Sequence, residues 1–375
     1  MDTRKDLKKA KRIVVKVGTS TITHDTGKMN LFRMEKLVRE LAGLANEGRE
    51  ILLVTSGAIA VGQDRMGLKE KPKAIPAKQA LAAIGQGILM HVYEKLFAEY
   101  GQIAAQVLLT KENSARHNQY MNCRNALLAT LKMHALPVIN ENDAIAVDEI
   151  KIGDNDTLSA TVATLVDADL LIILSDIDGL YTANPQTDKT AKLLTEIREV
   201  TPEVERMAGG AGSQRGTGGM YTKLQAAKIA VNSGVHMVIA SGSRDGVLRE
   251  ILAGQELGTL FHAKESHLKV RKSWLAFGKR LSGDIVVDAG CERAMLQGGS
   301  SLLAAGIVSV DGEFKEGSTV RVMSLSEREI ARGIVNYDAG ELAKIIGHRT
   351  NEFSGILQGK IHDEVIHRDN MVLMV

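Results

Sequence analysis

The chain has 375 residues, with 47 lysines and arginines against 45 aspartates and glutamates, which gives a net charge of +2. Its hydrophobic fraction of 44% is enough to fill a large core and excludes a disordered chain. The length is typical of two domains rather than one.

The two cysteines, Cys123 and Cys291, form neither a CxxC pair nor a disulfide framework, so we expect a reducing, cytoplasmic location. The basic N-terminus is not followed by the apolar run of a signal peptide, and no apolar run approaches the roughly 20 residues that a membrane span needs. We therefore expect a soluble protein that is not exported.

Short β-branched runs, each ending at a small or polar turn, recur up to residue 240. They predict strands at residues 13–17, 51–54, 138–139, 170–174 and 237–240. Between these runs apolar residues recur at spacings of three and four, as in 37–45 and 81–96, which predicts helices. The alternation predicts an α/β fold of the αβα sandwich type, with a mainly parallel sheet between helices.

After residue 281 the pattern changes to short strands with glycine turns. Strands are predicted at residues 284–288, 301–303, 306–310, 319–323 and 329–334, which indicates a small β-rich domain. The predicted organisation is an N-terminal domain at 1–263, a linker at 264–281, the β-rich domain at 282–360 and a C-terminal tail at 361–375.

Ligands bind at the carboxyl ends of the strands in an open α/β sheet, so residues there are candidates. Lys16 lies within the first predicted strand and precedes Gly18, Thr19 and Ser20. A buried lysine is costly unless its charge meets a partner, and a Gly/Thr/Ser turn offers N–H groups and hydroxyls to an anion. These residues predict a phosphate loop; the alternative is a lysine that reaches solvent from an edge strand.

A second glycine-rich stretch, residues 209–212 and 216–220, precedes a helical pattern that contains Lys223. Glycine-rich backbone that leads into a helix N-terminus binds anions, and Lys223 falls in the first turn, where it can reach a phosphate. The stretch is not a Walker A motif because no lysine directly follows its last glycine. The alternative is a flexible loop between two helices.

Polar and acidic clusters at residues 140–143 and 153–156 follow predicted strands. Such clusters can bind an amino group, coordinate Mg²⁺ or hold a lysine in position. The alternatives are turn residues and, at Asp156, a helix cap. Ser175 and Asp176 end another strand where a nucleotide could be contacted, and residues 56–58 form a turn suited to a small ligand.

Two lysines, glycine-rich loops and acidic groups suit phosphoryl transfer. A carboxylate acceptor, with a pKa of about 4.3, is ionised at pH 7 and needs no general base. This agrees with the lack of a nucleophile elbow or an HExxH pattern, and we predict no metal-ligand set among the ten scattered histidines. A dinucleotide fold starting at residues 85–87 is a rival reading, but Met90 replaces the third glycine and the motif lies inside a helical pattern.

Together these motifs resemble those of the glutamate 5-kinase family, a branch of the amino acid kinase superfamily with a C-terminal PUA domain. The matching segments cover nearly the whole chain in order, at residues 15–20, 54–60, 138–143, 153–156, 179–182 and 216–220. The strand with Lys16 and the Gly-Leu-Tyr-Thr segment are common to the superfamily. The segments Ser-Gly-Ala-Ile-Ala, Asn-Glu-Asn-Asp and Gly-Thr-Gly-Gly-Met are typical of glutamate 5-kinases.

The resemblance implies ATP-dependent phosphorylation of the γ-carboxylate of L-glutamate to L-glutamyl 5-phosphate, with Mg²⁺, as the first step of proline biosynthesis. It also implies feedback inhibition by proline, a homotetramer or homodimer, and delivery of the labile product to glutamyl phosphate reductase. By motif, Lys16 and Lys223 would neutralise the transferring phosphoryl group, and Asp156 would hold them in place. The residues implied to bind glutamate are Ser56, Asp143 and Asn155. Those implied to bind ATP are Lys16, Ser175, Asp176, Thr217, Gly218, Gly219, Met220, Tyr221, Thr222 and Lys223.

Two departures from the family pattern are visible. The usual Tyr-Thr-Ala-Asp-Pro-Arg segment carries Asn184 and Gln186 here, which removes a carboxylate and a guanidinium near the nucleotide. Cys123 stands where an alanine is expected, and a buried free thiol would fit there.

Residues 283–288, 298–303 and 306–310 resemble a PUA domain, which binds RNA in other proteins. Residues 282–360 carry 8 basic and 11 acidic residues, a net charge of −3, whereas RNA binding normally requires a basic surface. We expect a structural or regulatory module. The alternative is an RNA-binding protein with an inactive kinase domain, whose salt-sensitive RNA affinity would not depend on Lys16 or Lys223.

Overall fold

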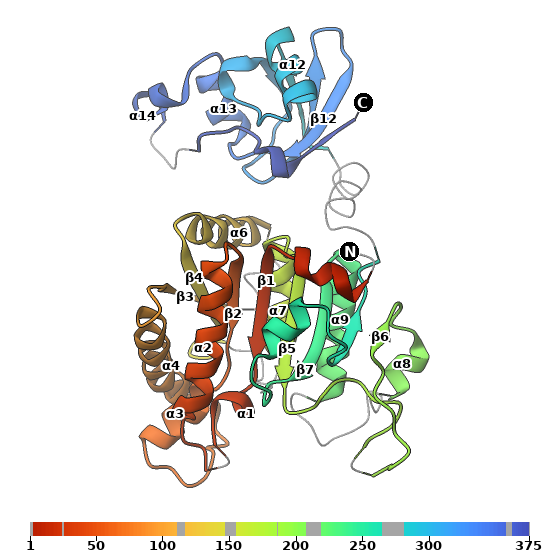
Figure 1. The fold of residues 1–375 in the computed structure, drawn as a ribbon. Helices are drawn as coiled ribbons and strands as arrows, with labels where there is room; N and C mark the ends of the chain where they lie inside the picture. The colour runs from red at the N-terminus through yellow and green to blue at the C-terminus, as the bar shows by residue number, and fades with distance from the viewer. Residues whose placement is uncertain are drawn as a thin grey trace. The chain divides into compact units, whose positions relative to one another are not determined.

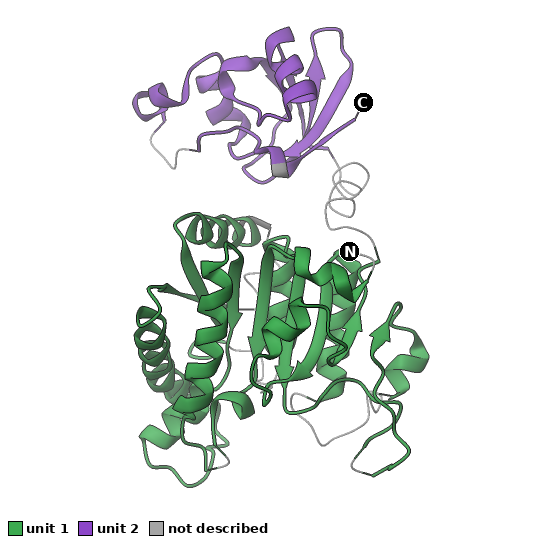
Figure 2. Cartoon of the chain, in the orientation of Figure 1, with its two compact units in different colours: residues 1–267 green, residues 268–375 purple. Residues whose placement is uncertain are grey.

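The computed structural model describes residues 3–24, 26–110, 117–146, 155–185, 187–207, 219–264, 281–357 and 362–374. The chain divides into two compact units, Met1–His267 and Leu268–Val375 (Figure 2). The linker predicted at residues 264–281 lies largely outside the described residues and stays a prediction.

The first unit is built on one eight-stranded sheet (Figure 1). Its spatial order is β3-β4-β2-β1-β5-β7-β8-β6, and all neighbouring strands are parallel except β7 and β8. The strands are β1 (Arg12–Val17), β2 (Glu50–Val54), β3 (Ile103–Leu109), β4 (Ala135–Glu141), β5 (Leu170–Ser175), β6 (Glu196–Ile197), β7 (His236–Ser241) and β8 (Thr259–Phe261). The predicted mainly parallel sheet is confirmed.

Helices cover both faces of this sheet (Figure 1). One apolar core lies between the sheet and α2 (Leu31–Asn46), α4 (Ile75–Ala98) and α10 (Val247–Leu252). A second core lies between the other face and α6 (His117–Lys132), α7 (Asn155–Leu165), α8 (Pro202–Met207) and α9 (Met220–Asn232). The remaining helices of this unit are the 3₁₀ helix η1 (Arg4–Lys9), α1 (Thr19–Ile22) and α3 (Ala58–Arg65).

The central strands are apolar on both faces because helices cover both. In β1, Val15 and Val17 pack into the first core and Val14 into the second. Successive side chains of a strand point to opposite faces, so Lys16 lies on the same face as Val14, toward the layer of α7 and α9. Arg12 begins the strand and pairs with Glu50, whereas Lys16 is a charged residue near its carboxyl end, among apolar neighbours.

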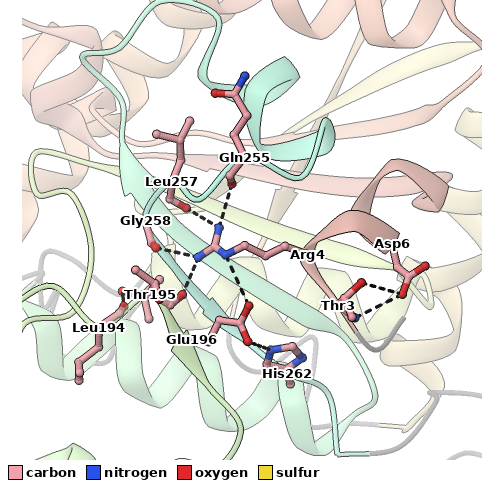
Figure 3. Close-up of polar contacts among 11 residues, drawn as sticks. Thr3, Arg4, Asp6, Leu194, Thr195, Glu196, Gln255, Leu257, Gly258 and His262 are labelled. Atoms are coloured by element: carbon pink, nitrogen blue, oxygen red, sulfur yellow. Dashed lines mark hydrogen bonds and ion pairs between the residues drawn. The ribbon is translucent and has the colours of Figure 1, made fainter.

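A buried arginine fastens the N-terminal helix to the β8 edge of the sheet (Figure 3). The Arg4 guanidinium donates to the carbonyl oxygens of Leu257 and Gly258, each at 2.8 Å, and to two further carbonyls. The Glu196 carboxylate lies 3.9 Å from the Arg4 Nε, and its other oxygen is 3.1 Å from the His262 Nε2. These contacts hold η1 against the segment that leads into β8.

The second unit contains a five-stranded sheet of order β10-β9-β11-β12-β13, antiparallel except for the β9–β11 pair. Its elements are β9 (Asp284–Val287), α12 (Ala289–Gly298), β10 (Ile307–Asp311), β11 (Thr319–Ser324), β12 (Glu329–Ile334), α13 (Ala339–Ile345), α14 (Phe353–Ile356) and β13 (Met371–Leu373). The strand predicted at 301–303 is wrong: Leu302 is buried and makes only an isolated bridge with Ile366.

Candidate active site

The candidate site lies at one edge of the large sheet, at the carboxyl ends of its central strands. β4, β2, β1 and β5 are neighbours and run parallel, so their carboxyl ends share that edge. Lys16 is near the end of β1, Asn140 is near the end of β4, and Ser175 ends β5. Thr55 and Ser56 follow β2 directly. Polar side chains thus replace apolar ones where the strands end.

Asp156 joins the two predicted catalytic lysines. Its carboxylate lies 2.7 Å from the Lys16 Nζ through Oδ1 and 3.4 Å from the Lys223 Nζ through Oδ2, and it accepts the Thr222 hydroxyl at 2.8 Å. Asp156 is 0% exposed, Lys223 4% and Lys16 7%. The structure therefore brings together three residues that are distant in sequence. It excludes a helix-capping role as the whole explanation of Asp156.

The electrostatics of this cluster favour an anion. Two buried ammonium groups share one carboxylate, which leaves an excess positive charge, and buried charges act more strongly on a ligand than exposed ones do. Burial and the charge of Lys223 lower the pKa of Lys16, while Asp156 opposes the shift. Burial alone would raise the pKa of Asp156, but the two lysines outweigh it and hold that pKa below its usual range. Asp156 therefore stays ionised.

Next to this cluster lies a set of carboxamides and hydroxyls. The Asn155 Nδ2 donates to the Ser56 hydroxyl at 2.8 Å and to the Thr55 carbonyl at 2.9 Å, and it also lies 3.1 Å from the Asn140 Oδ1. Because Asn155 and Asp156 are consecutive at the start of α7, the amides and the lysine pair occupy adjoining parts of one site. Ser56 and Asn155, predicted to bind glutamate, are in direct contact.

Asp143, the third predicted glutamate ligand, lies on the turn that follows β4. Burial raises its pKa, and the charge of Lys71 opposes that rise. The turn is tied to α4 because the Gln79 side chain donates to the Ala146 carbonyl at 3.1 Å. Asp143 is therefore a partly buried carboxylate just after β4, and its contact with glutamate stays a prediction.

The predicted nucleotide residues fall partly within the described chain. The Ser175 hydroxyl donates to the Asp176 carboxylate at 2.9 Å, and the charge of Asp176 acts on Lys16. Gly219 caps α9, whose first turns carry Met220, Tyr221 and Thr222. In the predicted phosphate loop Gly18 caps α1, which begins with Thr19 and Ser20, and a Cβ atom added at Gly18 would lie 3.7 Å from the Lys16 Nζ. Thr217, Gly218 and residues 153–154 and 209–212 lie outside the described residues.

Comparison with known proteins decides the family. The profile of the amino acid kinase family matches residues 11–241, and that of the PUA domain matches residues 283–357. The glutamate 5-kinase of Moorella thermoacetica is 52% identical over 98% of this chain and 97% of its own length. That of Caldanaerobacter subterraneus is 54% identical over 97% of this chain and 98% of its own. The chain belongs to the glutamate 5-kinases of the amino acid kinase family.

The crystal structure of a UMP kinase from Bacillus anthracis also aligns with this glutamate 5-kinase family member, over 68% of this chain and 97% of that one, at 17% identity and a TM-score of 0.47. The resemblance to the glutamate 5-kinases and the PUA assignment of the β-rich unit are confirmed by the family matches. No helix in the described part of the chain is long and apolar enough to cross a bilayer.

Two of the residues that depart from the glutamate 5-kinase pattern, Asn184 and Cys123, lie within the described part of the chain. Asn184 lies in a turn, where its carbonyl accepts the N–H groups of Thr187 and Asp188, while Gln186 is outside the described residues. Cys123 is a free thiol on α6, half-buried against the second core, and burial raises its pKa. A thiol in that setting is held in its neutral form, which agrees with the predicted inert role.

Sequence reasoning did not single out several residues of the amide set. Asn140 was visible only as the first member of the cluster at 140–143, and its position at the end of a strand was the available signal. Thr55, whose hydroxyl lies 2.9 Å from the Tyr93 hydroxyl, precedes the recognised Ser56. Gln86, whose Oε1 accepts the Asn140 Nδ2 at 2.8 Å, was noted only in the Gly-Gln-Gly segment weighed as a dinucleotide motif, and its place inside a long helix gave no sign of this contact.

Proposed function

We propose that this protein transfers the γ-phosphoryl group of ATP to the γ-carboxylate of L-glutamate, giving L-glutamyl 5-phosphate and ADP as the first step of proline biosynthesis. The observation that carries the proposal is the buried Asp156 carboxylate between Lys16 and Lys223, beside the amides of the acceptor site. The membership in the glutamate 5-kinase family supports the choice of glutamate as acceptor.

The chemistry needs little from the protein besides position and charge. A carboxylate oxygen of glutamate forms a bond to the γ-phosphorus while the bond to the bridging oxygen breaks, and the electron pair leaves with ADP. The γ-carboxylate is already ionised at neutral pH, so no proton has to be removed. Lys16 and Lys223 stabilise the negative charge on the transferring group, and Asp156 fixes their ammonium groups.

Recognition of glutamate is assigned to the amide side of the site. The Ser56 hydroxyl and the Asn155 carboxamide offer hydrogen bonds to a bound amino acid, and the Asp143 carboxylate offers a charge partner for its ammonium group. In this arrangement the γ-carboxylate points toward the lysines and the ammonium group toward Asp143. The nucleotide then lies on the other side, against Ser175, Asp176 and the start of α9.

Mg²⁺ is proposed to enter with the nucleotide. Among the described residues no three His, Cys, Asp or Glu side chains are grouped to hold a metal ion. Mg²⁺ commonly binds through substrate phosphates, waters and one or two carboxylates, a donor set to which Asp176 could contribute. Bound there, the ion would neutralise charge on the ATP phosphates.

Regulation and partners follow as further proposals. Proline shares the carboxylate and the ammonium group of glutamate, so we expect it to inhibit by competing for the acceptor site. We also propose a homotetramer or homodimer, and a reductase that takes up the labile acyl phosphate. Cys123 and Cys291 are free thiols, which favours a location in the reducing cytoplasm.

Incubation with ATP, Mg²⁺ and L-glutamate in the presence of hydroxylamine tests the acceptor. The acyl phosphate should be trapped as glutamyl hydroxamate, in an amount equal to the ADP formed. Aspartate and N-acetylglutamate serve as matched acceptors of related chemistry. Product from either of them, with none from glutamate, would assign the site to another amino acid kinase.

A further inference from the structure

A chain of three side-chain amides runs from α4 into the acceptor site. Gln86, in the middle of α4 and 9% exposed, accepts the Asn140 Nδ2 through its Oε1 at 2.8 Å. The Asn140 Oδ1 in turn lies 3.1 Å from the Asn155 Nδ2. Gln86 has no place in the phosphoryl-transfer mechanism, yet it is joined to a predicted glutamate ligand through one intervening residue.

Neighbouring backbone groups identify the oxygen and the nitrogen of each side-chain amide, because a peptide N–H can only donate and a carbonyl can only accept. The Asn140 side chain accepts the peptide N–H of Glu141 at 2.9 Å, so the atom there must be its oxygen. The Asn155 side chain donates to the Thr55 carbonyl at 2.9 Å, so the atom there must be its nitrogen. Asn140 is then left with its nitrogen facing Gln86, where it needs an acceptor.

The orientation leaves one atom for a ligand. The Asn155 Nδ2 faces the Thr55 carbonyl, the Ser56 hydroxyl and the Asn140 oxygen. The Asn155 Oδ1 must therefore point the other way, and it is a buried oxygen with no hydrogen-bond partner among the described residues. A buried acceptor of this kind is costly unless a ligand N–H meets it.

Next to Gln86, α4 packs closely against α3. A Cβ atom added at Gly85 would lie 1.8 Å from the Ala58 carbonyl oxygen, and one at Gly62 would lie 2.0 Å from that of Leu81. The two helices thus touch through their backbones next to Gln86. Gly85 of the Gly-Gln-Gly segment is thus a helix-packing residue, and the segment lies inside α4 rather than at the start of a dinucleotide site.

We propose that Gln86 is a positioning residue for the acceptor site: it fixes the Asn140 carboxamide, which fixes that of Asn155, so that the Asn155 Oδ1 is presented to the ammonium group of the substrate. The role of Gln86 is to make the site select an amino acid over a dicarboxylic acid without the amino group. This inference rests on the proposed function and adds to it a residue on α4.

The test compares L-glutamate with glutarate, which lacks the ammonium group. In Gln86→Met, a change of similar volume without the acceptor, the KM for L-glutamate should rise about tenfold and kcat should stay within about twofold. The inhibition constant of glutarate should stay within about twofold, because glutarate has no N–H for Asn155 to accept. Gln63→Met, a change on α3 that removes a side-chain hydrogen bond to the Leu68 carbonyl, is the matched control and should change neither constant.

Three outcomes oppose the inference. An unchanged KM in a folded Gln86→Met protein removes Gln86 from the role, and an equal rise in the glutarate constant shows a general loss of packing instead. If Gln86→Met does not fold, Gln86→Glu keeps an acceptor oxygen toward Asn140 and should retain the preference for glutamate; loss of that preference contradicts the proposal. A wild-type protein that does not phosphorylate glutamate would overturn the proposed function itself, so the wild-type activity is measured before any variant is made.

Discussion

At the scale of single residues, replacement of Lys223 gives the most direct test of the proposed mechanism. The buried Lys223 ammonium group lies 3.4 Å from Asp156, and in the proposed mechanism it acts on charge that develops during transfer rather than on bound glutamate. Lys223→Ala should therefore lower kcat by about 100-fold or more and change the KM for glutamate by less than about threefold. Steady-state kinetics measure both constants.

Lys228 is the matched control for that change. It lies on the same helix, five residues further along, and its ammonium group pairs with Glu205 near the surface. Lys228→Ala should leave kcat within about twofold, because a partly exposed ion pair contributes little. A normal kcat in Lys223→Ala would remove Lys223 from catalysis.

The raised pKa of Asp143 predicts that the KM for glutamate depends on pH. Burial raises its pKa above the usual value, so the carboxylate becomes protonated as the pH falls through that raised value. In the proposed arrangement the ammonium group of glutamate then loses its charge partner, and the KM for glutamate should rise toward acidic pH while kcat changes less. In Asp143→Asn the KM should be about tenfold higher at neutral pH and lack this acid rise. The γ-carboxylate of glutamate titrates equally in both proteins, so their difference isolates Asp143, and identical profiles would exclude it.

At the scale of elements, α3 and α4 provide a pair of glycines with opposite predictions. Gly85→Ala places a methyl group 1.8 Å from the Ala58 carbonyl and should lower the free energy of unfolding by about 3 kcal/mol. Gly87, two residues away in the same helix, has nothing within 4 Å of an added Cβ, so Gly87→Ala should raise stability by about 0.5–1 kcal/mol. Urea unfolding of both variants checks the signs, and equal effects would contradict the backbone contact between α3 and α4.

The sequence predicted the elements that are buried on both faces. β1, β2, β5 and β7 were found because they are continuous apolar runs between turns. β3 was missed because it is an edge strand with partly exposed residues and no such run, and β6 and β8 because they have only two and three residues. The strand predicted at 301–303 failed because one buried leucine does not make a ladder.

Site residues could be predicted from the sequence where a polar or charged side chain lies at the end of a predicted strand. Lys16 lies within an apolar run, and Ser56 and Ser175 lie at the ends of two others. Lys223 and Asp156 were found from the glycine-rich stretch before a helix and from the acidic cluster at 153–156, and the family resemblance gave them their roles. Gln86 could not be found in this way, because only the fold brings a residue from the middle of α4 to the acceptor amides. Which groups share one carboxylate is likewise a property of the fold.

At the scale of the whole molecule, the net charge of +2 is a cancellation. Residues 1–281 carry 38 basic and 31 acidic residues, a net charge of +7, and residues 282–375 carry 9 and 14, a net charge of −5. The positive residues 1–281 suit ATP and an acidic amino acid, whereas the negative residues 282–375, which contain the PUA match, repel a polyanion.

This distribution predicts that the full chain does not bind RNA specifically. Fluorescence anisotropy with a structured RNA at about 50 and 200 mM salt should show, at most, weak binding that disappears at the higher concentration. Any such binding should come from the basic residues 1–281 and compete with ATP. Tight binding that is unaffected by ATP and persists in a Lys16→Ala, Lys223→Ala double variant would favour the RNA-binding alternative.

The central claim is that the Lys16–Asp156–Lys223 cluster drives attack of a glutamate carboxylate oxygen on the γ-phosphorus of ATP. Glutamate labelled with ¹⁸O in both γ-carboxylate oxygens tests it directly, because hydroxylamine breaks the acyl phosphate at carbon and releases phosphate. Mass spectrometry should find one ¹⁸O atom in each phosphate released with the hydroxamate. Unlabelled phosphate would show that water is the acceptor and would contradict the account.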